Sequence, residues 1–153
     1  MRNRLMHTAL YGLALIGLGT GLGCGGGYES TVQGIVTLDS KTVPTGTVSF
    51  SPQSSGPAVF SLIDEQGHYK LRTGKSEGLP AGQYAVSISA TGPSTGKWSG
   101  SGPRPSGKPI TPAWYANPST SGLTFTVEPG DNEINLELTS TPPAGWKPPA
   151  GRR

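Results

Sequence analysis

Alternating apolar and polar residues mark several short segments of the chain as β-strands. The clearest case runs from Tyr84 to Ser89, where Tyr84, Val86 and Ile88 alternate with small or polar residues. Successive side chains of a strand point to opposite faces of a sheet, so this pattern predicts a strand with one buried face. Other segments share the pattern or are rich in β-branched residues, and they lie at about 31–38, 47–50, 58–63, 69–71, 123–127 and 134–138.

Turn-forming residues separate these strands. Leu79 to Gly82 predicts a tight turn before the clearest strand, and Asp64 to Gly67 predicts a hairpin turn with Tyr69 opening the returning strand. Glycine suits such positions because it adopts positive φ angles readily. Pro129 to Asn132 predicts a turn that joins the last two strands as an antiparallel pair.

Seven short strands, each apolar on one side, predict an all-β protein. Helical periodicity is absent beyond the first 23 residues, and the 153-residue chain holds 24 glycines and 15 prolines, a high content for a helical protein. Such strands bury little surface alone but form a core when two sheets pack face to face. We therefore predict one β-sandwich domain over residues 31–140.

The N-terminal segment has the layout of a secretory signal. Arg2 and Arg4 precede an apolar run over residues 9–23, which ends at Gly23 and is followed by Cys24, the only cysteine. The run is short of the ~20 apolar residues that a permanent membrane-spanning helix needs. We predict a helical signal peptide over residues 1–23 and a glycine-rich tether over 24–30.

Cys24 resembles the modified cysteine of bacterial lipoproteins. In that family the cysteine after a small residue receives a diacylglycerol thioether and becomes the new N-terminus, and Gly23 provides the small residue, whereas Gly21 and Leu22 differ from the usual pattern. The alternatives are an ordinary signal cleaved at another position and a buried, unmodified cysteine. Acyl chains contribute ~0.8 kcal/mol per buried methylene, so a lipidated Cys24 would anchor the protein to a membrane.

Charge excludes one class of partner. Removal of Arg2 and Arg4 with the signal lowers the formal charge from +3 to +1 (3 − 2). Nucleic-acid binding calls for a clustered basic surface, so we expect no nucleic-acid partner. The tail over residues 141–153 is proline-rich and basic, and we predict that it is disordered.

Several motifs occur in an order that resembles a known sandwich. They are Gly34-Ile35-Val36, Gly46 to Pro52, Asp64 to Tyr69, Gly78 to Val86, Ile110 to Tyr115, Ser121 to Thr124 and Asn132 to Asn135. Their order is similar to that of the transthyretin-like, carboxypeptidase-regulatory-like domain of short exported lipoproteins in planctomycete-type bacteria. The resemblance implies a seven-stranded antiparallel Greek-key β-sandwich in the cell envelope, anchored to a membrane and facing the periplasm or exterior, and no enzymatic activity is known for the group.

Candidate catalytic and metal-binding groups are few. His68 is the single histidine outside the signal, and no neighbour in sequence would orient it as a base. Zinc needs three or four His, Cys or carboxylate ligands, and the 64–67 turn lacks the alternating oxygen ligands of a calcium loop. The acidic residues Asp131, Glu133 and Glu137 fit an exposed strand face. We predict no enzymatic activity, no metal and no cofactor; a hydrolase using His68 would rest on fold analogy alone.

A long loop over residues 91–121 holds the remaining candidates. It carries Trp98, Trp114 and Tyr115, three basic residues and no acidic one. Exposed aromatics can stack on a sugar ring or bind a partner, whereas docked aromatics would cover an open edge or end of the sandwich, which we favour for Trp114 and Tyr115. The sequence thus predicts a lipid-anchored envelope protein with a non-catalytic interaction or structural module, whose partner is an envelope protein or a polysaccharide. The alternative is a carbohydrate-binding module that uses these loop aromatics.

Overall fold

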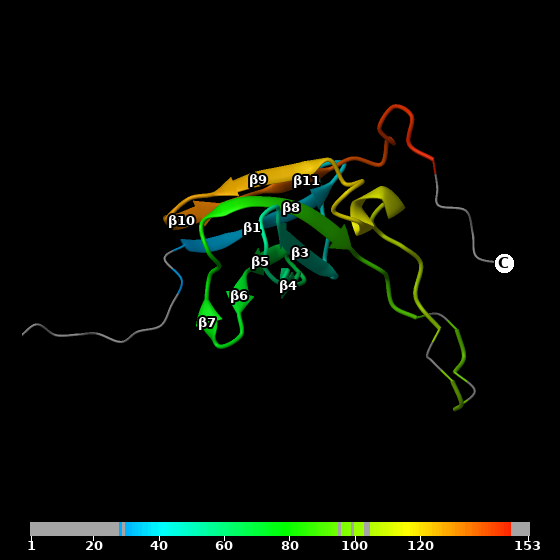
Figure 1. Cartoon of the computed structure of the whole chain (residues 1–153). Helices are drawn as coiled ribbons and strands as arrows, with labels where there is room; N and C mark the ends of the chain where they lie inside the picture. The colour runs from blue at the N-terminus through cyan, green and yellow to red at the C-terminus, as the bar shows by residue number, and fades with distance from the viewer. Residues whose placement is uncertain (1–27, 29, 95, 99, 103–104, 148–153) are drawn as a thin grey trace, which may run out of the picture.

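The structure is a computed structural model that describes residues 28, 30–94, 96–98, 100–102 and 105–147, and this part of the chain is all-β (Figure 1). A single 3₁₀ turn, η1 (Ala113–Ala116), accompanies the strands, and no described helix is long and apolar enough to cross a membrane. The strands are β1 (Ser30–Leu38), β2 (Lys41–Thr42), β3 (Thr47–Pro52), β4 (Val59–Leu62), β5 (His68–Lys70), β6 (Arg72–Thr73), β7 (Ser76–Glu77), β8 (Gly82–Ser89), β9 (Leu123–Val127), β10 (Gly130–Glu133) and β11 (Leu136–Leu138).

One sheet is a regular antiparallel sheet of four strands in the order β4-β3-β8-β9. The predicted alternation is confirmed here, because Val48 and Phe50 of β3 and Tyr84, Val86 and Ile88 of β8 are buried. Their neighbours in sequence point to the opposite face, where small hydroxyl side chains prevail.

The second sheet is built around β1. β2 and β5 pair with it in antiparallel fashion, whereas β10 and β11 pair with it in parallel. The register is the same along the whole parallel edge, since residue 30 pairs with 130 and residue 36 pairs with 136. β10 and β11 therefore continue one another along β1, and the interruption falls at Ile134 and Asn135.

The prediction that the last two strands form an antiparallel pair is wrong. β9 pairs with β8 in one sheet, while β10 and β11 pair with β1 in the other. The turn after Pro129 thus carries the chain from one sheet to the other. Exclusively antiparallel pairing is likewise wrong for β1. The predicted exposure of Asp131, Glu133 and Glu137 is confirmed.

The turn predicted at Asp64–Gly67 is present, but the hairpin predicted around it is wrong, because the turn connects the two sheets. β4 before the turn pairs with β3, and β5 after it pairs with β1. The turn closes through backbone hydrogen bonds between Asp64 and His68 (2.9 Å) and from Gly67 N–H to the Asp64 carbonyl (3.0 Å). We call the junction of β4, this turn and β5 the seam. It closes the gap between the two sheets on one side of the body.

A continuous hydrophobic core fills the space between the sheets. Phe50 of β3 lies at its centre, with ring centroids 6.2 Å from Tyr69 and 6.0 Å from Tyr84. Phe50, Tyr69 and Tyr84 come from different strands, so one aromatic cluster joins both sheets. Burial of such side chains contributes about 1.5–3 kcal/mol each.

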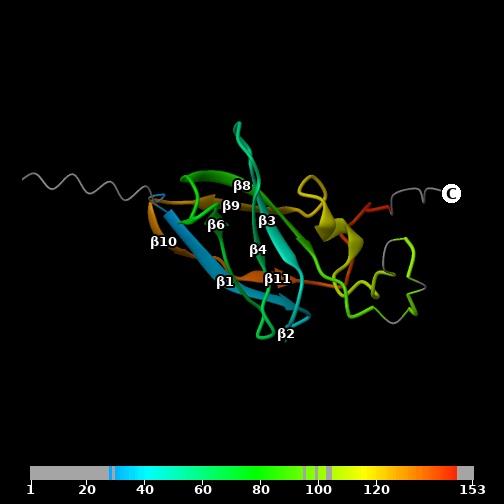
Figure 2. The ribbon, with the colours of Figure 1, turned by 90° about the horizontal axis from the view of Figure 1, so that it is seen from below.

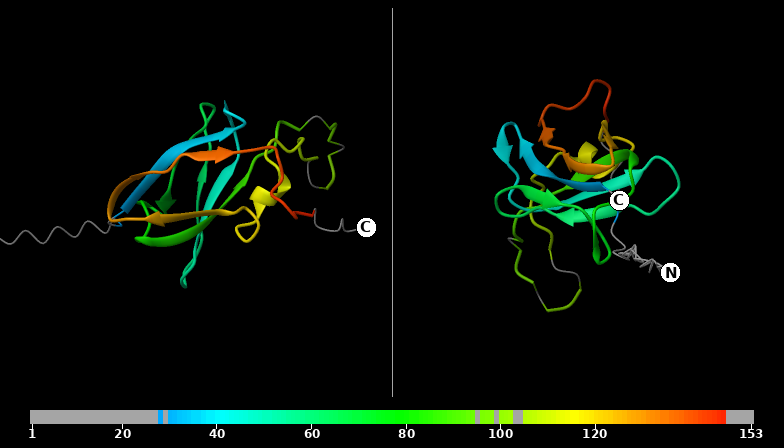
Figure 3. Two further views of the ribbon diagram at one scale, coloured as in Figure 1. Left: turned by 90° about the horizontal axis from the view of Figure 1, so that it is seen from above. Right: turned by 90° about the vertical axis from the view of Figure 1, so that its left-hand side faces the viewer.

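The two ends of the body differ (Figures 1 and 2). β1 and β10 begin at the same end as the start of β8, because Ser30 pairs with Gly130 and Gly82 pairs with Val127. The described residues of the 91–110 loop and η1 lie at the opposite end, where β8 ends. The left panel of Figure 3 shows the same separation from above, and the right panel looks at the end where β1 begins.

Gly34 allows the two halves of the parallel edge to meet β1 closely. A Cβ at Gly34 would lie 2.0 Å from the Ile134 carbonyl oxygen and 3.2 Å from the Tyr69 ring. We expect Gly34→Ala to lower the free energy of unfolding by about 2 kcal/mol or more, because backbone cannot move aside cheaply. Urea unfolding followed by circular dichroism measures this.

The matched control is Gly92→Ala, where the added Cβ would meet only the Lys108 carbonyl at 3.6 Å, an ordinary contact. We expect this variant to unfold close to the natural chain. Equal midpoints for the two variants would contradict the tight approach of Ile134 to β1.

Candidate functional site

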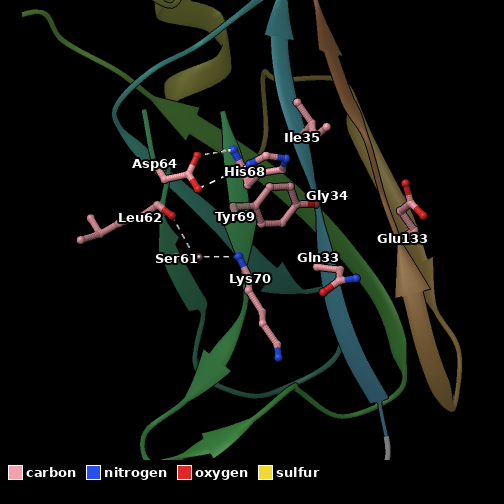
Figure 4. Close-up of a pocket in the computed structure, with 10 residues that line it drawn as sticks. All are labelled: Gln33, Gly34, Ile35, Ser61, Leu62, Asp64, His68, Tyr69, Lys70 and Glu133. Atoms are coloured by element: carbon pink, nitrogen blue, oxygen red, sulfur yellow. Dashed lines mark hydrogen bonds and ion pairs between the residues drawn. The ribbon is translucent and has the colours of Figure 1, made fainter. Parts of the chain in front are cut away.

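A concave surface lies where β1, β5 and β10 meet the edge of β4 (Figure 4). It is an open groove of about 700 Å³. Gln33, Lys70 and Glu133 are register partners on the outward face of the second sheet, and Ile35 and His68 form the next pair. Ser61, Leu62 and Asp64 form the rim that β4 and the following turn contribute.

Side chains of the rim satisfy the outer backbone edge of β5. The Asp64 carboxylate accepts the backbone N–H of His68 (2.8 Å) and of Gln66 (2.9 Å). Ser61 Oγ accepts the backbone N–H of Lys70 (3.2 Å) and donates to the Leu62 carbonyl (3.1 Å). These bonds occupy the donors through which an added strand would pair with β5, so the seam does not present an open edge.

Ser61, Asp64 and His68 have the composition of a hydrolytic triad, but their contacts are structural. His68 Nδ1 lies 3.5 Å from Asp64 Oδ2, and both side chains are more than half exposed. The Ser61 hydroxyl is engaged with backbone groups on both sides rather than with the imidazole. A nucleophile needs a base in hydrogen-bond contact, and these contacts hold the seam instead.

Backbone hydrogen bonds also set the charge state of the rim. The hydrogen bond from the His68 N–H, with that from Gln66, lowers the pKa of the Asp64 carboxyl against a smaller opposing effect of desolvation. Lys70 Nζ lies 2.9 Å from Glu77 Oε2, which lowers the pKa of Glu77. The groove therefore presents an ionised carboxylate at its rim and a lysine already paired at its base.

Tyr69 forms the floor of the groove. Its hydroxyl donates to the Ile134 carbonyl at 2.7 Å, and burial raises the pKa of that hydroxyl. The ring therefore joins β5 to the interruption between β10 and β11. Within the described ranges, no group of three or more His, Cys, Asp or Glu residues could hold a metal ion.

Two of the aromatic candidates, Trp114 and Tyr115, are buried. They keep 7 % and 5 % of their surface exposed and belong to the core. The Tyr115 hydroxyl accepts the backbone N–H of Thr139 at 3.1 Å, which links η1 to the end of β11. They close the end of the body between the sheets and offer no free ring face to a ligand.

The beginning of the C-terminal tail is docked. The Trp146 ring packs edge-on against Trp114 with centroids 4.9 Å apart, and Trp146 packs on the core. Within the tail that was predicted to be disordered, Trp146 therefore has an aromatic packing partner. Residues 148–153 lie outside the described residues.

Trp98 is the candidate that the structure leaves accessible, with 48 % of its surface exposed. Its indole N–H donates to the Gly102 carbonyl at 3.0 Å. A short neck holds the base of this loop, since Gly92 N–H donates to the Lys108 carbonyl at 2.8 Å and Thr91 bridges Pro109. The three aromatic candidates do not converge on one surface. Cys24 and the predicted signal peptide lie outside the described residues.

Sequence reasoning missed Phe60 and Leu62. Both are on β4 and point outward, with 62 % and 78 % of their surface exposed. The segment 58–63 was expected to be a strand, but its sequence Ala-Val-Phe-Ser-Leu-Ile is apolar on both faces and does not reveal which face is buried. Only the pairing of Val59 with Phe50 identifies the inner face.

Comparison of the chain with protein-family models, curated proteins and solved structures finds no match.

The two hydrogen bonds that the Asp64 carboxylate accepts make the free energy of unfolding depend on pH. We call this carboxylate the Asp64 cap. A carboxyl whose pKa is lower in the folded state stabilises the fold above its unfolded pKa of about 3.9, and the contribution disappears as the pH decreases through the folded value. We expect Asp64→Asn to be less stable than the natural chain at pH 7 and to lose less stability below about pH 4. Urea midpoints between pH 7 and pH 2.5 measure both effects.

Glu65→Gln is the control, because Glu65 lies in the same turn and takes no part in these hydrogen bonds. It should leave the pH 7 midpoint unchanged. A pH profile for Asp64→Asn that parallels the natural one would exclude Asp64 as the acid-sensitive cap.

Proposed function

We propose that this chain is a lipid-anchored cell-envelope protein, exported by its N-terminal signal and attached to a membrane through Cys24. Its β-sandwich serves as a non-catalytic interaction or structural module that faces the periplasm or exterior. The resemblance to the transthyretin-like domains of exported lipoproteins supports this proposal on the motifs given above. Its partners are the membrane and an envelope protein or polysaccharide, not nucleic acid.

The strand arrangement is compatible with the seven-stranded Greek-key sandwich that the resemblance implies. The antiparallel sheet has four strands. β10 and β11 act as one strand beside β1, and β2 and β5 flank the other side of β1, which gives three further strand positions. The resemblance implies antiparallel pairing throughout, and the parallel pairing of β1 with β10 and β11 differs from it.

The observation that carries the proposal is the separation between the two ends of the body. Ser30 opens β1 six positions after Cys24, at the end where β8 and β10 also begin. The long loop and η1 lie at the opposite end. An anchor at Cys24 would hold one end near the membrane and direct the loop with Trp98 away from it.

The groove supports a non-catalytic role. Its serine and aspartate form hydrogen bonds with the backbone of β5 and the preceding turn. Its lysine is paired with Glu77. These groups stabilise the seam between the two sheets, and the exposed surfaces of the sheets remain for interaction.

Metabolic labelling with palmitate and mass spectrometry of the mature N-terminus test the anchor. The natural chain should begin at Cys24, carry a diacylglycerol thioether and fractionate with membranes, because two acyl chains give stable anchoring. Cys24→Ala should lose the label completely, whereas Gly27→Ala, which keeps the cysteine, should retain it. A label that persists in Cys24→Ala, or a mature N-terminus at another residue, would refute the proposal.

A further inference from the structure

The four-stranded sheet is free of charged residues. None of β3, β4, β8 and β9 contains an Asp, Glu, Lys, Arg or His. The sheet around β1 is different, since His68, Lys70, Asp131, Glu133 and Glu137 all belong to its strands. Of these two sheets, only the one around β1 therefore carries charged strand residues, and the separate β6-β7 pair adds Arg72 and Glu77.

The outward face of the charge-free sheet is rich in hydroxyl groups. The pairing register places Ser49 beside both Phe60 and Ser87, and Ala85 beside both Ser51 and Thr124. We call this surface the neutral face. Its outward residues are Thr47, Ser49, Ser51, Phe60, Leu62, Gln83, Ala85, Ser89, Thr124 and Thr126, and Ser87 lies among them but is buried.

The hydroxyls of the neutral face differ from those elsewhere in the fold. Thr31, Thr73 and Thr111 use their hydroxyls in hydrogen bonds with other parts of the chain. Among the hydrogen bonds of the described residues, none involves a side-chain hydroxyl of the neutral face. Ser89, Thr124 and Thr126 are also exposed, so their donors and acceptors face solvent.

Phe60 and Leu62 give the face an apolar border. They lie along the edge strand β4, opposite Ser49 and Thr47, and both are more than half exposed. An exposed aromatic ring beside a row of hydroxyls provides one group that stacks and several that form hydrogen bonds. A ligand that carries many hydroxyl groups and has an apolar ring face can form both kinds of contact, stacking and hydrogen bonds.

We propose that the neutral face binds an uncharged polysaccharide, with Phe60 stacking on a sugar ring and the hydroxyls of β3, β8 and β9 bonding to sugar hydroxyls. The inference rests on the proposed envelope location and names the class of partner. A charge-free face provides no attraction for anionic polymers or anionic lipid, which basic groups recognise. An uncharged polymer that is rich in hydroxyl groups matches the neutral face both in its lack of charge and in its hydrogen-bonding groups.

A second copy of the chain is the weaker occupant. Stable interfaces between copies have strongly apolar centres, and the apolar side chains of the neutral face lie at its border on β4 while its centre carries serine and threonine. The hydroxyls at the centre favour a hydrogen-bonding ligand over a protein surface that buries apolar area.

Affinity electrophoresis of the full chain tests the proposal, in a polyoxyethylene detergent that carries no sugar. Each gel contains one neutral polymer, which is hydroxyethyl cellulose, a mannan or a galactan. Carboxymethyl cellulose is the anionic control, because it has the same cellulose backbone as hydroxyethyl cellulose. At least one neutral polymer should retard the chain more than the anionic polymer does.

Four variants identify the surface. Phe60→Ala should weaken retardation at least about tenfold, equivalent to about 1.4 kcal/mol. Thr124→Lys introduces a charge on the neutral face and should weaken it as well, whereas Gln33→Lys adds the same charge to the other sheet and should not. Trp98→Ala should leave retardation unchanged. Urea midpoints for each variant confirm that a loss of binding is not a loss of fold.

Several results would overturn the inference. These are no retardation by any neutral polymer, a loss confined to Trp98→Ala, an equal loss in Gln33→Lys, and sedimentation as a dimer that Phe60→Ala dissociates. The palmitate experiment is independent of these readouts. A lipidated chain that binds no neutral polymer would refute the inference alone, and an unlipidated chain that binds would refute the anchor alone.

Discussion

The parallel pairing of β1 with the C-terminal strands is the constraint on which the rest of the structure depends. β1 is the interior of its sheet, and its partners β10 and β11 lie about a hundred residues further along the chain, since residue 30 pairs with 130. Contacts of such large sequence separation are slow to form because the entropy of loop closure opposes them. The core between the two sheets is complete only when this edge is in place.

The interruption at Ile134 and Asn135 shows how that edge is held. Ile134 N–H donates to the Gln33 carbonyl, and Asn135 Oδ1 accepts the Ile35 N–H in place of a backbone carbonyl. The Tyr69 hydroxyl bonds to the Ile134 carbonyl from within the core. A break in a strand would leave backbone groups unpaired, and here the side chain of Asn135 in the interruption itself and that of Tyr69 in β5 satisfy them. Gly34 leaves the space in which this happens.

The sequence was sufficient to locate most strands but not to assign them to sheets. The alternation over residues 84–89 identifies a half-buried strand because the period of two reports which face is apolar. It does not report the partner, and the turn at Pro129–Asn132 suits a hairpin as well as a crossing between sheets. The two apolar faces of β4 gave no indication of its orientation. That information resides in the pairing of Val59 with Phe50, which depends on the whole fold.

The candidate surfaces were hidden for a similar reason. The net charge of +3 describes an average over the chain, whereas the four-stranded sheet is charge-free and the sheet around β1 is charged. Strands that are far apart in sequence form each sheet, so no window along the chain reveals the division. Trp114 and Tyr115 illustrate the opposite case, because an apolar cluster in a long loop fits both an exposed site and a cap. The Tyr115 hydroxyl accepts a hydrogen bond from the backbone just after β11, and this contact identifies the cluster as a cap on the end of the body.

The direction of the strands determines what the neutral face could meet at a membrane. β8 runs from the end near Ser30 toward the end that carries the long loop, so the charge-free sheet forms a side of the body rather than a tip. A chain anchored six residues before Ser30 would therefore have the end beside Ser30 tethered to the membrane, and this side would extend between the two ends. A polymer of the surrounding envelope layer could contact such a side over its full length, whereas the flat membrane surface could reach only the end beside the anchor.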